Sequence, residues 1–193
     1  MFPFVFDGVK LMQALIYGSK SYAKLVAQIA KECGYQIEGY IDDFGGEGLG
    51  SYVQNRDRIL KNGIPLFLGI GYANLEARFQ VLQKLLTDDA KLANLVHPRA
   101  FVSSAAELGP ANIVMAGSSI DAFCVVGAGN VFWPGSVLSH DSRVGNNTFF
   151  SPSSTSCGFT RIGSSVFVGA NAVIVDNTEV PSGTFIKAHA IYQ

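Results

Sequence analysis

The order of apolar and polar residues changes character about halfway along the chain. In the first half, short apolar runs alternate with segments in which apolar residues recur at helical spacing. This order predicts three strands, at 13–17, 36–41 and 65–70. It also predicts three helices: one that begins in the segment 18–24 and ends at residue 32, one at 53–60 and one at 74–86. Alternation of strand and helix is typical of a small parallel sheet with its ligand at the carboxyl ends of the strands.

In the second half the apolar residues recur at every sixth position from Val102 to Ile186, with Ser156 as the one exception. Four places after almost every apolar position stands a small or slim residue. This period suits neither a helix nor an ordinary strand. It is typical of a triangular β-helix, in which three hexapeptides make a coil of about eighteen residues and coils stack about 4.8 Å apart. We therefore predict an α/β domain over 1–95 and a parallel β-helix over 96–193.

The repeat register separates the three histidines of the chain. His140 falls at the third position of its hexapeptide, so its imidazole is predicted to point outward near a corner, either for function or as a plain surface group. Gly158 lies one coil further on, where a glycine is a turn requirement or lets a substrate approach an N–H that stabilises an oxyanion. Asp141 either orients the imidazole or is a surface carboxylate. We interpret His97 and His189 as structural or solvated.

One column of apolar residues occupies the last position of successive hexapeptides on one side of the predicted prism. Val131, Phe149, Phe167 and Phe185 follow one another at intervals of one coil. The pattern predicts an exposed apolar stripe along one edge. Because monomers seldom leave such a stripe uncovered, we expect it to form a subunit contact, and a three-sided prism is compatible with a homotrimer; the alternative is a set of scattered surface phenylalanines.

Composition narrows the class of protein. The net charge is −1 and charged residues make up 15% of the chain, without blocks of like charge, which argues against a nucleic-acid partner. No apolar run is long enough to span a membrane, and Met1–Lys10 lacks the basic leader of a secretory signal. The three cysteines show no CxxC spacing, which indicates reduced thiols and a cytoplasmic protein.

Four motifs together resemble one family, the sialic-acid O-acetyltransferases and bacterial nucleotide-sugar N-acetyltransferases. They are Tyr40–Asp43 after the second strand, Phe67–Gly71 with Asn74 after the third, His97-Pro98 at the junction, and Ser139–Gly145 around His140. Members of this family join a small Rossmann-like domain to a left-handed parallel β-helix of hexapeptide repeats. The resemblance covers nearly the whole chain, and the front-domain motifs make it more specific than the repeats alone.

The resemblance implies an acetyl-CoA-dependent acetyltransferase acting on the amine or hydroxyl of a nucleotide-linked sugar, in cell-surface polysaccharide or glycan biosynthesis. It implies His140 as general base, Asp141 as its acidic helper and Gly158 beside the acetyl carbonyl, with direct transfer and no metal. The implied nucleotide-sugar contacts are Gly18, Ser19, Asp42, Asp43, Gly71 and Asn74. The implied acetyl-CoA contacts, in a groove between subunits of a homotrimer, are Gly158, Gly169, Ala170 and Lys187.

The chain departs from the family pattern at three places. The first loop, 18–24, lacks the usual glycine-rich sequence with a histidine. Phe149 stands where some sugar N-acetyltransferases carry a second histidine near the acceptor. Residues 185–189 replace the usual closing Gly-x-Pro-Ala-Lys, which bears on the contacts to the adenine end of the coenzyme.

Three other functions compete with this interpretation. A dinucleotide-dependent oxidoreductase would need a GxGxxG loop, whereas the first loop offers Gly18 alone. A zinc-dependent hydratase on the same prism would need about three histidine ligands, and the middle coils offer only His140. The third alternative is a non-catalytic binding or scaffold protein that keeps the prism without turnover.

Overall fold

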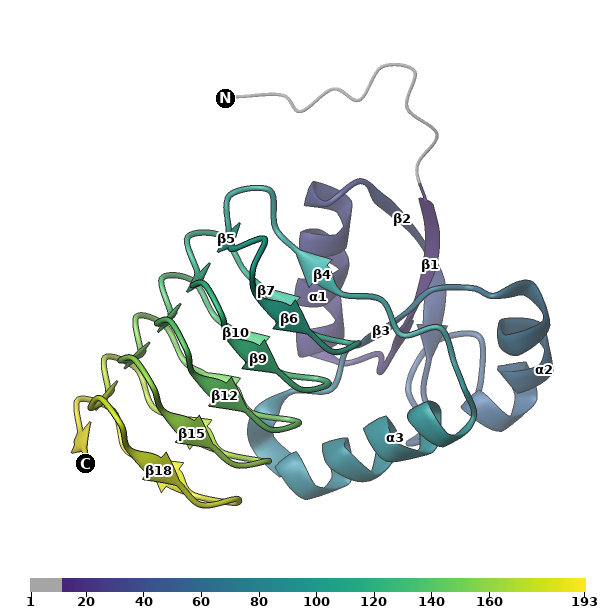
Figure 1. Cartoon of the computed structure of the whole chain (residues 1–193). Coiled ribbons are helices and arrows are strands. Elements are labelled where there is room, and N and C mark those ends of the chain that lie inside the picture. Colours follow the sequence, from purple (N-terminus) through teal and green to yellow (C-terminus); the bar gives the residue numbers. More distant parts are fainter. Residues whose placement is uncertain (1–11) are drawn as a thin grey trace.

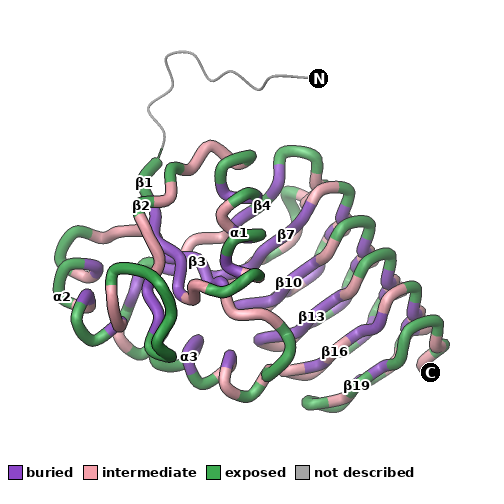
Figure 2. Tube along the Cα trace, turned by 180° about the vertical axis from the view of Figure 1, so that it is seen from behind, coloured by how far each residue is buried: buried purple, intermediate pink, exposed green. Residues whose placement is uncertain are grey.

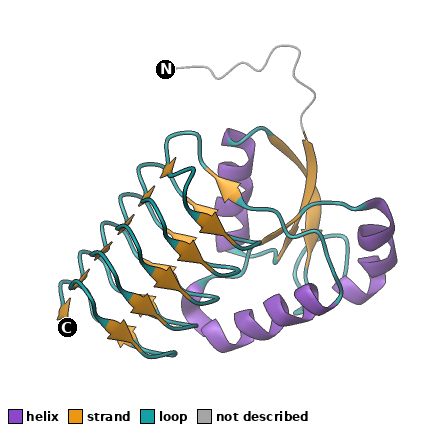
Figure 3. Ribbon diagram, viewed as in Figure 1, coloured by secondary structure: helices purple, strands orange, loops and turns teal. Residues whose placement is uncertain are grey.

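The structure is a computed structural model that describes residues 12–193. It consists of an α/β part followed by a parallel β-solenoid of about five turns (Figure 1). Between residues 12 and 193, helices occur only in the α/β part, and the solenoid consists of very short strands joined by turns (Figure 3). The segment Met1–Lys10, in which we expect no secretory signal, lies outside the described residues. Within residues 12–193, no helix combines the length and apolar character needed to cross a membrane.

The α/β part contains a three-stranded parallel sheet in the order β2-β1-β3. Its strands are β1 (Met12–Tyr17), β2 (Tyr35–Ile41) and β3 (Leu66–Leu68). Its helices are α1 (Ser21–Glu32), α2 (Tyr52–Asn62), the short 3-10 helix η1 (Tyr72–Asn74) and α3 (Leu75–Thr87). All six predicted elements are confirmed, with bounds that shift by a few residues. The loops after the three strands meet at one edge of the sheet, as parallel strands require.

The solenoid has three sides, each a parallel sheet of two-residue strands. The first side contains β4 (Leu95–Val96), β7 (Ile113–Val114), β10 (Val131–Phe132), β13 (Phe149–Phe150), β16 (Phe167–Val168) and β19 (Phe185–Ile186). The second contains β5 (Phe101–Val102), β8 (Ser119–Ile120), β11 (Val137–Leu138), β14 (Thr155–Ser156), β17 (Val173–Ile174) and β20 (Ile191–Tyr192). The third contains β6 (Glu107–Leu108), β9 (Val125–Val126), β12 (Arg143–Val144), β15 (Arg161–Ile162) and β18 (Glu179–Val180).

The predicted repeat register is confirmed by burial. The apolar residues at every sixth position form one continuous core inside the prism, and only Val102 and Leu108 of the first coil remain partly exposed. Ser156, the exception in the pattern, is fully buried and still satisfied, because its hydroxyl lies 2.7 Å from that of Thr160. Thr160 in turn donates to the Ser142 hydroxyl at 3.0 Å. A short buried chain of hydroxyls therefore replaces one apolar side chain.

The structure corrects the prediction of an exposed apolar stripe. Val131 and Phe149 are fully buried instead of exposed, because the α/β part of the same chain packs on the first side of the solenoid (Figure 2). The Phe149 ring lies 5.4 Å from that of Tyr72, and Phe167, which is half-buried, lies 5.2 Å from the same ring. Only Phe185, beyond the reach of the α/β part, is exposed, at 67%.

Arg78 of α3 joins the two parts from a fully buried position. Its Nε donates to the carbonyl of Ile70 at 2.9 Å, and its Nη1 donates to the carbonyl of Gly129 at 2.7 Å and to the side-chain oxygen of Asn147. The guanidinium also lies over the Phe149 ring, 5.1 Å from its centroid. Burial lowers the pKa of Arg78 to about 10. Arg78 thus ties the loop after β3 to two coils of the solenoid.

Candidate active site

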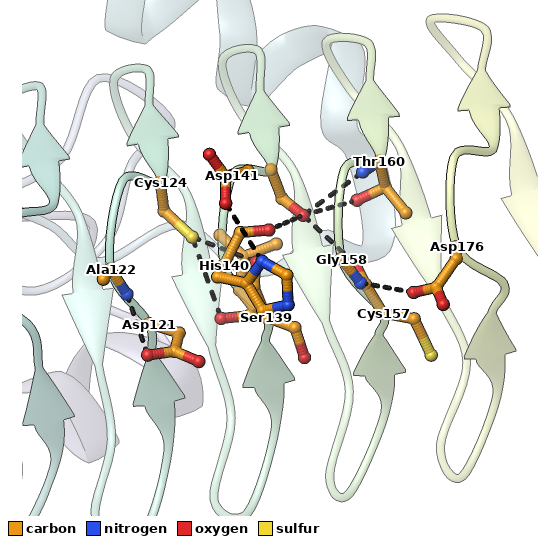
Figure 4. Close-up of polar contacts among 12 residues, drawn as sticks. Asp121, Ala122, Cys124, Ser139, His140, Asp141, Cys157, Gly158, Thr160 and Asp176 are labelled. Carbon is orange, nitrogen blue, oxygen red and sulfur yellow. Dashed lines mark hydrogen bonds and ion pairs between the residues drawn. The ribbon is translucent and has the colours of Figure 1, made fainter.

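His140 lies in the turn between β11 and β12, at the corner between the second and third sides (Figure 4). We call this the His140 corner. The side chain of His140 is 49% exposed, as the register predicts. Its Nδ1 lies 3.0 Å from a carboxylate oxygen of Asp141, the next residue, which adopts a left-handed backbone conformation with φ 58°. The turn therefore brings two sequence neighbours into contact, although adjacent side chains usually point apart.

This contact sets the chemistry available to the imidazole. When His140 is neutral, a proton on Nδ1 donates to the Asp141 carboxylate and leaves the lone pair on Nε2. Nε2 can then accept a proton from a nucleophile, and the carboxylate stabilises the imidazolium that forms. Both side chains are partly open to solvent, so a substrate can reach the ring.

Gly158 lies one coil beyond His140, directly against the imidazole (Figure 4). A β-carbon at this position would stand 3.0 Å from Cε1 and 3.1 Å from Nε2 of His140, closer than side chains normally approach. The backbone N–H of Gly158 donates to Oδ1 of Asp176 at 2.7 Å. The Gly158 N–H, which the sequence suggests as an oxyanion donor, thus lies next to His140. In this structure it already donates its hydrogen bond to Asp176.

Sequence reasoning missed two neighbours of this site. Asp176 lies one coil beyond Gly158, so the same register that paired His140 with Gly158 would have found it. The Phe159 ring stands perpendicular to the imidazole at a centroid distance of 5.2 Å. Cys157, beside Gly158, is not activated, because burial and then the Asp176 carboxylate raise the pKa of its thiol. A protonated thiol is a poor nucleophile, which fits direct transfer better than a covalent intermediate.

A cavity of about 310 Å³ opens in the α/β part where the loops after β1, β2 and β3 meet. Five of the six predicted nucleotide-sugar residues line it, namely Gly18, Ser19, Asp42, Gly71 and Asn74. The N-terminus of α1 also borders the cavity through Lys20, Ser21 and Tyr22. Lys20 precedes the helix without capping it, and the first turn carries no acidic residue. Unpaired N–H groups at a helix N-terminus beside a lysine favour a phosphate.

Asp42 and Asp43 have different roles in the fold. Asp42 borders the cavity and is held by the backbone N–H of Phe44 at 2.7 Å and by the Ser19 hydroxyl. Asp43 lies outside the cavity lining and accepts from the Tyr17 hydroxyl and from the N–H of Tyr52, both at 2.6 Å. Burial acts to raise the pKa of Asp43, but these donors and Lys84 together lower it below its usual value. The contacts of Asp43 therefore stabilise the fold and do not face the cavity.

Three predicted coenzyme contacts lie away from His140. Gly169 and Ala170 follow β16, and Lys187 follows β19, so all three lie at the corner between the first and second sides. We call this the Gly169 corner. Gly158, the fourth predicted contact, lies at the His140 corner. One copy of the chain thus does not bring the four residues together.

The described residues show no preassembled metal site within one copy. No group of three or more histidine, cysteine, aspartate or glutamate side chains lies close enough together between residues 12 and 193 to hold an ion. His97 is buried, with Nε2 3.0 Å from a Glu32 carboxylate oxygen and Nδ1 accepting the N–H of Arg99. His189 is exposed in the last coils.

A scan of the sequence against models of known protein families finds no match. Solved structures, in contrast, match nearly the whole chain. The acetyltransferase domain of PglB from Neisseria gonorrhoeae has a TM-score of 0.84 at 25% identity, covering 94% of this chain and 91% of that one. The same domain in complex with acetyl coenzyme A has a TM-score of 0.83 at 24% identity, covering 95% of this chain and 93% of that one.

PerB from Caulobacter crescentus, solved in complex with CoA and GDP-perosamine, also has a TM-score of 0.84 at 25% identity. The match covers 95% of this chain and 90% of that one. A related structure names the Caulobacter enzyme a GDP-perosamine N-acetyltransferase. The resemblance to nucleotide-sugar acetyltransferases that the sequence motifs indicate is therefore confirmed over both parts of the fold.

Proposed function

We propose that this chain is an acetyltransferase that moves the acetyl group of acetyl-CoA to an amine or hydroxyl of a nucleotide-linked sugar, in cell-surface polysaccharide or glycan biosynthesis. The observation that carries the proposal is the exposed His140–Asp141 pair, stacked on Gly158, in a fold shared over nearly its whole length with PerB. An imidazole whose Nδ1 contacts Asp141 and whose Nε2 can accept a proton is suited to remove a proton from a nucleophile.

In the proposed reaction, Nε2 of His140 accepts a proton while the sugar nitrogen or oxygen forms a bond to the acetyl carbon. The carbon–sulfur bond then breaks, the electron pair leaves with the coenzyme sulfur, and the proton returns from His140 to that thiolate. The Asp141 carboxylate stabilises the intermediate imidazolium. The Gly158 N–H stabilises the oxyanion once Asp176 releases it, because an N–H serves one strong acceptor at a time.

The nucleotide of the sugar binds in the cavity of the α/β part. Support comes from the meeting of three strand ends, from the uncapped N-terminus of α1 and from Lys20 at the same rim. Of the implied contacts, Asp43 has the weakest support, because its oxygens face Tyr17, Tyr52 and Lys84. We propose that Asp43 acts through the loop that carries Asp42.

We further propose that the active protein is a homotrimer whose sites form between copies. The α/β part covers the first side, so the opposite corner, which carries His140, points away from the nucleotide cavity of the same copy. A second copy has to bring its own cavity to His140. The same arrangement would let Gly169, Ala170 and Lys187 of one copy share a coenzyme with Gly158 of another. The subunit contact then uses the second and third sides instead of the predicted stripe.

The finer features of the fold belong to the same proposal. The chain divides into a Rossmann-like nucleotide-sugar domain over 1–95, of which the structure describes 12–95, and a left-handed β-helix over 96–193 that carries the chemistry. The register of the coils and the order β2-β1-β3 support this division. We place the protein in the cytoplasm, which agrees with three cysteines that form no disulfide.

A transfer assay tests the proposal against its alternatives. Purified protein is incubated with acetyl-CoA and a panel of nucleotide amino sugars and nucleotide sugars, and product is identified by mass spectrometry. Acetylated nucleotide sugar is the expected result. Binding of both ligands without turnover would instead favour the scaffold protein. Stoichiometric zinc, together with hydratase activity and no transfer, would favour the hydratase.

A further inference from the structure

The turns at the solenoid corners need one residue per turn in the left-handed backbone conformation. Glycine reaches this conformation freely, and asparagine and aspartate tolerate it, whereas a bulky side chain is strained there. Nearly all such turns between residues 105 and 190 carry glycine or a small residue. Phe123 with φ 63° and Phe159 with φ 59° are the two bulky apolar exceptions. At the His140 corner, Phe123 occupies the turn one coil before Asp141, and Phe159 occupies the turn one coil after it.

Neither phenylalanine gains much burial in exchange. Phe123 is 65% exposed and Phe159 is 51% exposed. A strained backbone together with an exposed apolar ring lowers stability, so packing within the chain does not explain either residue. Strained residues that persist without a packing gain tend to lie at functional sites.

Only one of the two rings touches the proposed base. The Phe159 ring stands at 90° to the His140 imidazole with centroids 5.2 Å apart, a favourable edge-to-face arrangement. No aromatic contact of this kind involves Phe123 among the described residues. The imidazole therefore contacts Asp141 at Nδ1, faces the Gly158 backbone at Cε1 and Nε2, and has the Phe159 ring beside it.

We propose that Phe159 is a positioning residue for His140, and the inference rests on the proposed acetyl transfer. Asp141 holds one atom of a half-exposed ring, and the Gly158 N–H beside the ring is donated to Asp176, so these two neighbours do not fix the orientation of the imidazole. The Phe159 ring removes this freedom and keeps Nε2 aimed along the corner toward the next coil. Small losses of alignment cost a reaction step a large factor in rate, which is why a strained turn is retained here.

The test replaces each phenylalanine by asparagine, which suits the left-handed turn. Phe159→Asn and Phe123→Asn form a matched pair, because both relieve the same strain and remove the same exposed ring. The two variants should change Tm by similar amounts, because they alter the same kind of turn at the same corner. Only Phe159→Asn should lower kcat, by about tenfold, with the KM for acetyl-CoA within about twofold of the wild-type value. Phe159→Tyr keeps the ring and should keep most of kcat.

A second readout does not depend on turnover. The ring current of Phe159 should displace the NMR signals of the His140 ring protons, and Phe159→Asn should move them toward random-coil positions while Phe123→Asn leaves them in place. Unchanged His140 signals in Phe159→Asn would overturn the inference. So would an equal fall of kcat in both variants, or dissociation of the assembly by Phe159→Asn alone, which sedimentation detects. Absence of transfer by the wild-type protein would overturn the proposed function, and the NMR signals would then decide the role of Phe159.

Discussion

At the scale of single residues, contacts between adjacent coils decide which atoms of the His140 corner are available. The Asp176 side chain accepts the Gly158 N–H from the preceding coil. At the next corner, the side-chain oxygens of Asn146, Ser164 and Ser182 each accept the backbone N–H at the matching position of the preceding coil. The Asp176 contact is therefore an ordinary cap of the solenoid. It becomes important here because the capped N–H stands beside the base.

Asp176→Ala should raise kcat/KM for acetyl-CoA by about three- to tenfold. The substitution frees the Gly158 N–H for the thioester oxygen and removes a carboxylate that repels a developing oxyanion. Asp176→Asn is the matched control, because its side-chain oxygen can still accept from Gly158, and it should remain closer to the wild-type value. Steady-state kinetics measures both. A fall in kcat/KM for Asp176→Ala would show that the carboxylate assists the reaction.

Asp43 gives the α/β part a pH-dependent stability. Its folded-state pKa is lower than usual, so its contribution is present above the unfolded pKa and is lost as pH falls through the folded pKa. Asp43→Asn should therefore lower Tm at pH 7, and the difference from the wild type should shrink below about pH 4. Thermal unfolding across this pH range measures the effect. A difference that stays constant with pH would contradict the role given to the Asp43 charge.

At the scale of elements, the contact between α3 and the solenoid depends on Arg78. Arg78→Met leaves the carbonyls of Ile70 and Gly129 without their donor and should destabilise the protein by about 3 kcal/mol. For a chain of this length the fall in Tm should be roughly 6–12 °C. Arg56→Met, which breaks the solvent-screened pair with Asp88, is the control and should lower Tm much less than Arg78→Met. Equal losses in the two variants would contradict a special role for Arg78.

The elements themselves could be predicted because their signals are local. Periodicity located the strands and helices, and the period of six placed His140 outside the core and Gly158 beside it. The prediction of an exposed stripe was wrong, because the pattern shows that Phe149 must be covered but does not show that the α/β part of the same chain covers it. The cap by Asp176 and the wall formed by Phe159 were missed because they depend on side-chain directions at a turn, which periodicity does not report.

At the scale of the whole molecule, the nucleotide cavity and His140 lie on opposite sides of one copy, so the proposed reaction needs residues from two copies. Ala73→Trp should block the cavity, which Ala73 lines, and His140→Ala removes the base. Each variant alone should be nearly inactive. Subunits of the two variants, dissociated and reassembled together, should recover about a quarter of the wild-type activity, because each site then draws its two halves at random. No recovery in verified mixed assemblies would place both halves in one copy.

Acetyl transfer depends on His140 as its base, and the decisive measurement is kcat/KM of His140→Ala with acetyl-CoA and the accepted nucleotide sugar. Loss of a general base predicts a fall of at least about one hundredfold. Sedimentation should show an assembly of unchanged size, because the half-exposed imidazole contributes little packing. Transfer at the wild-type rate by His140→Ala would show that another group removes the proton.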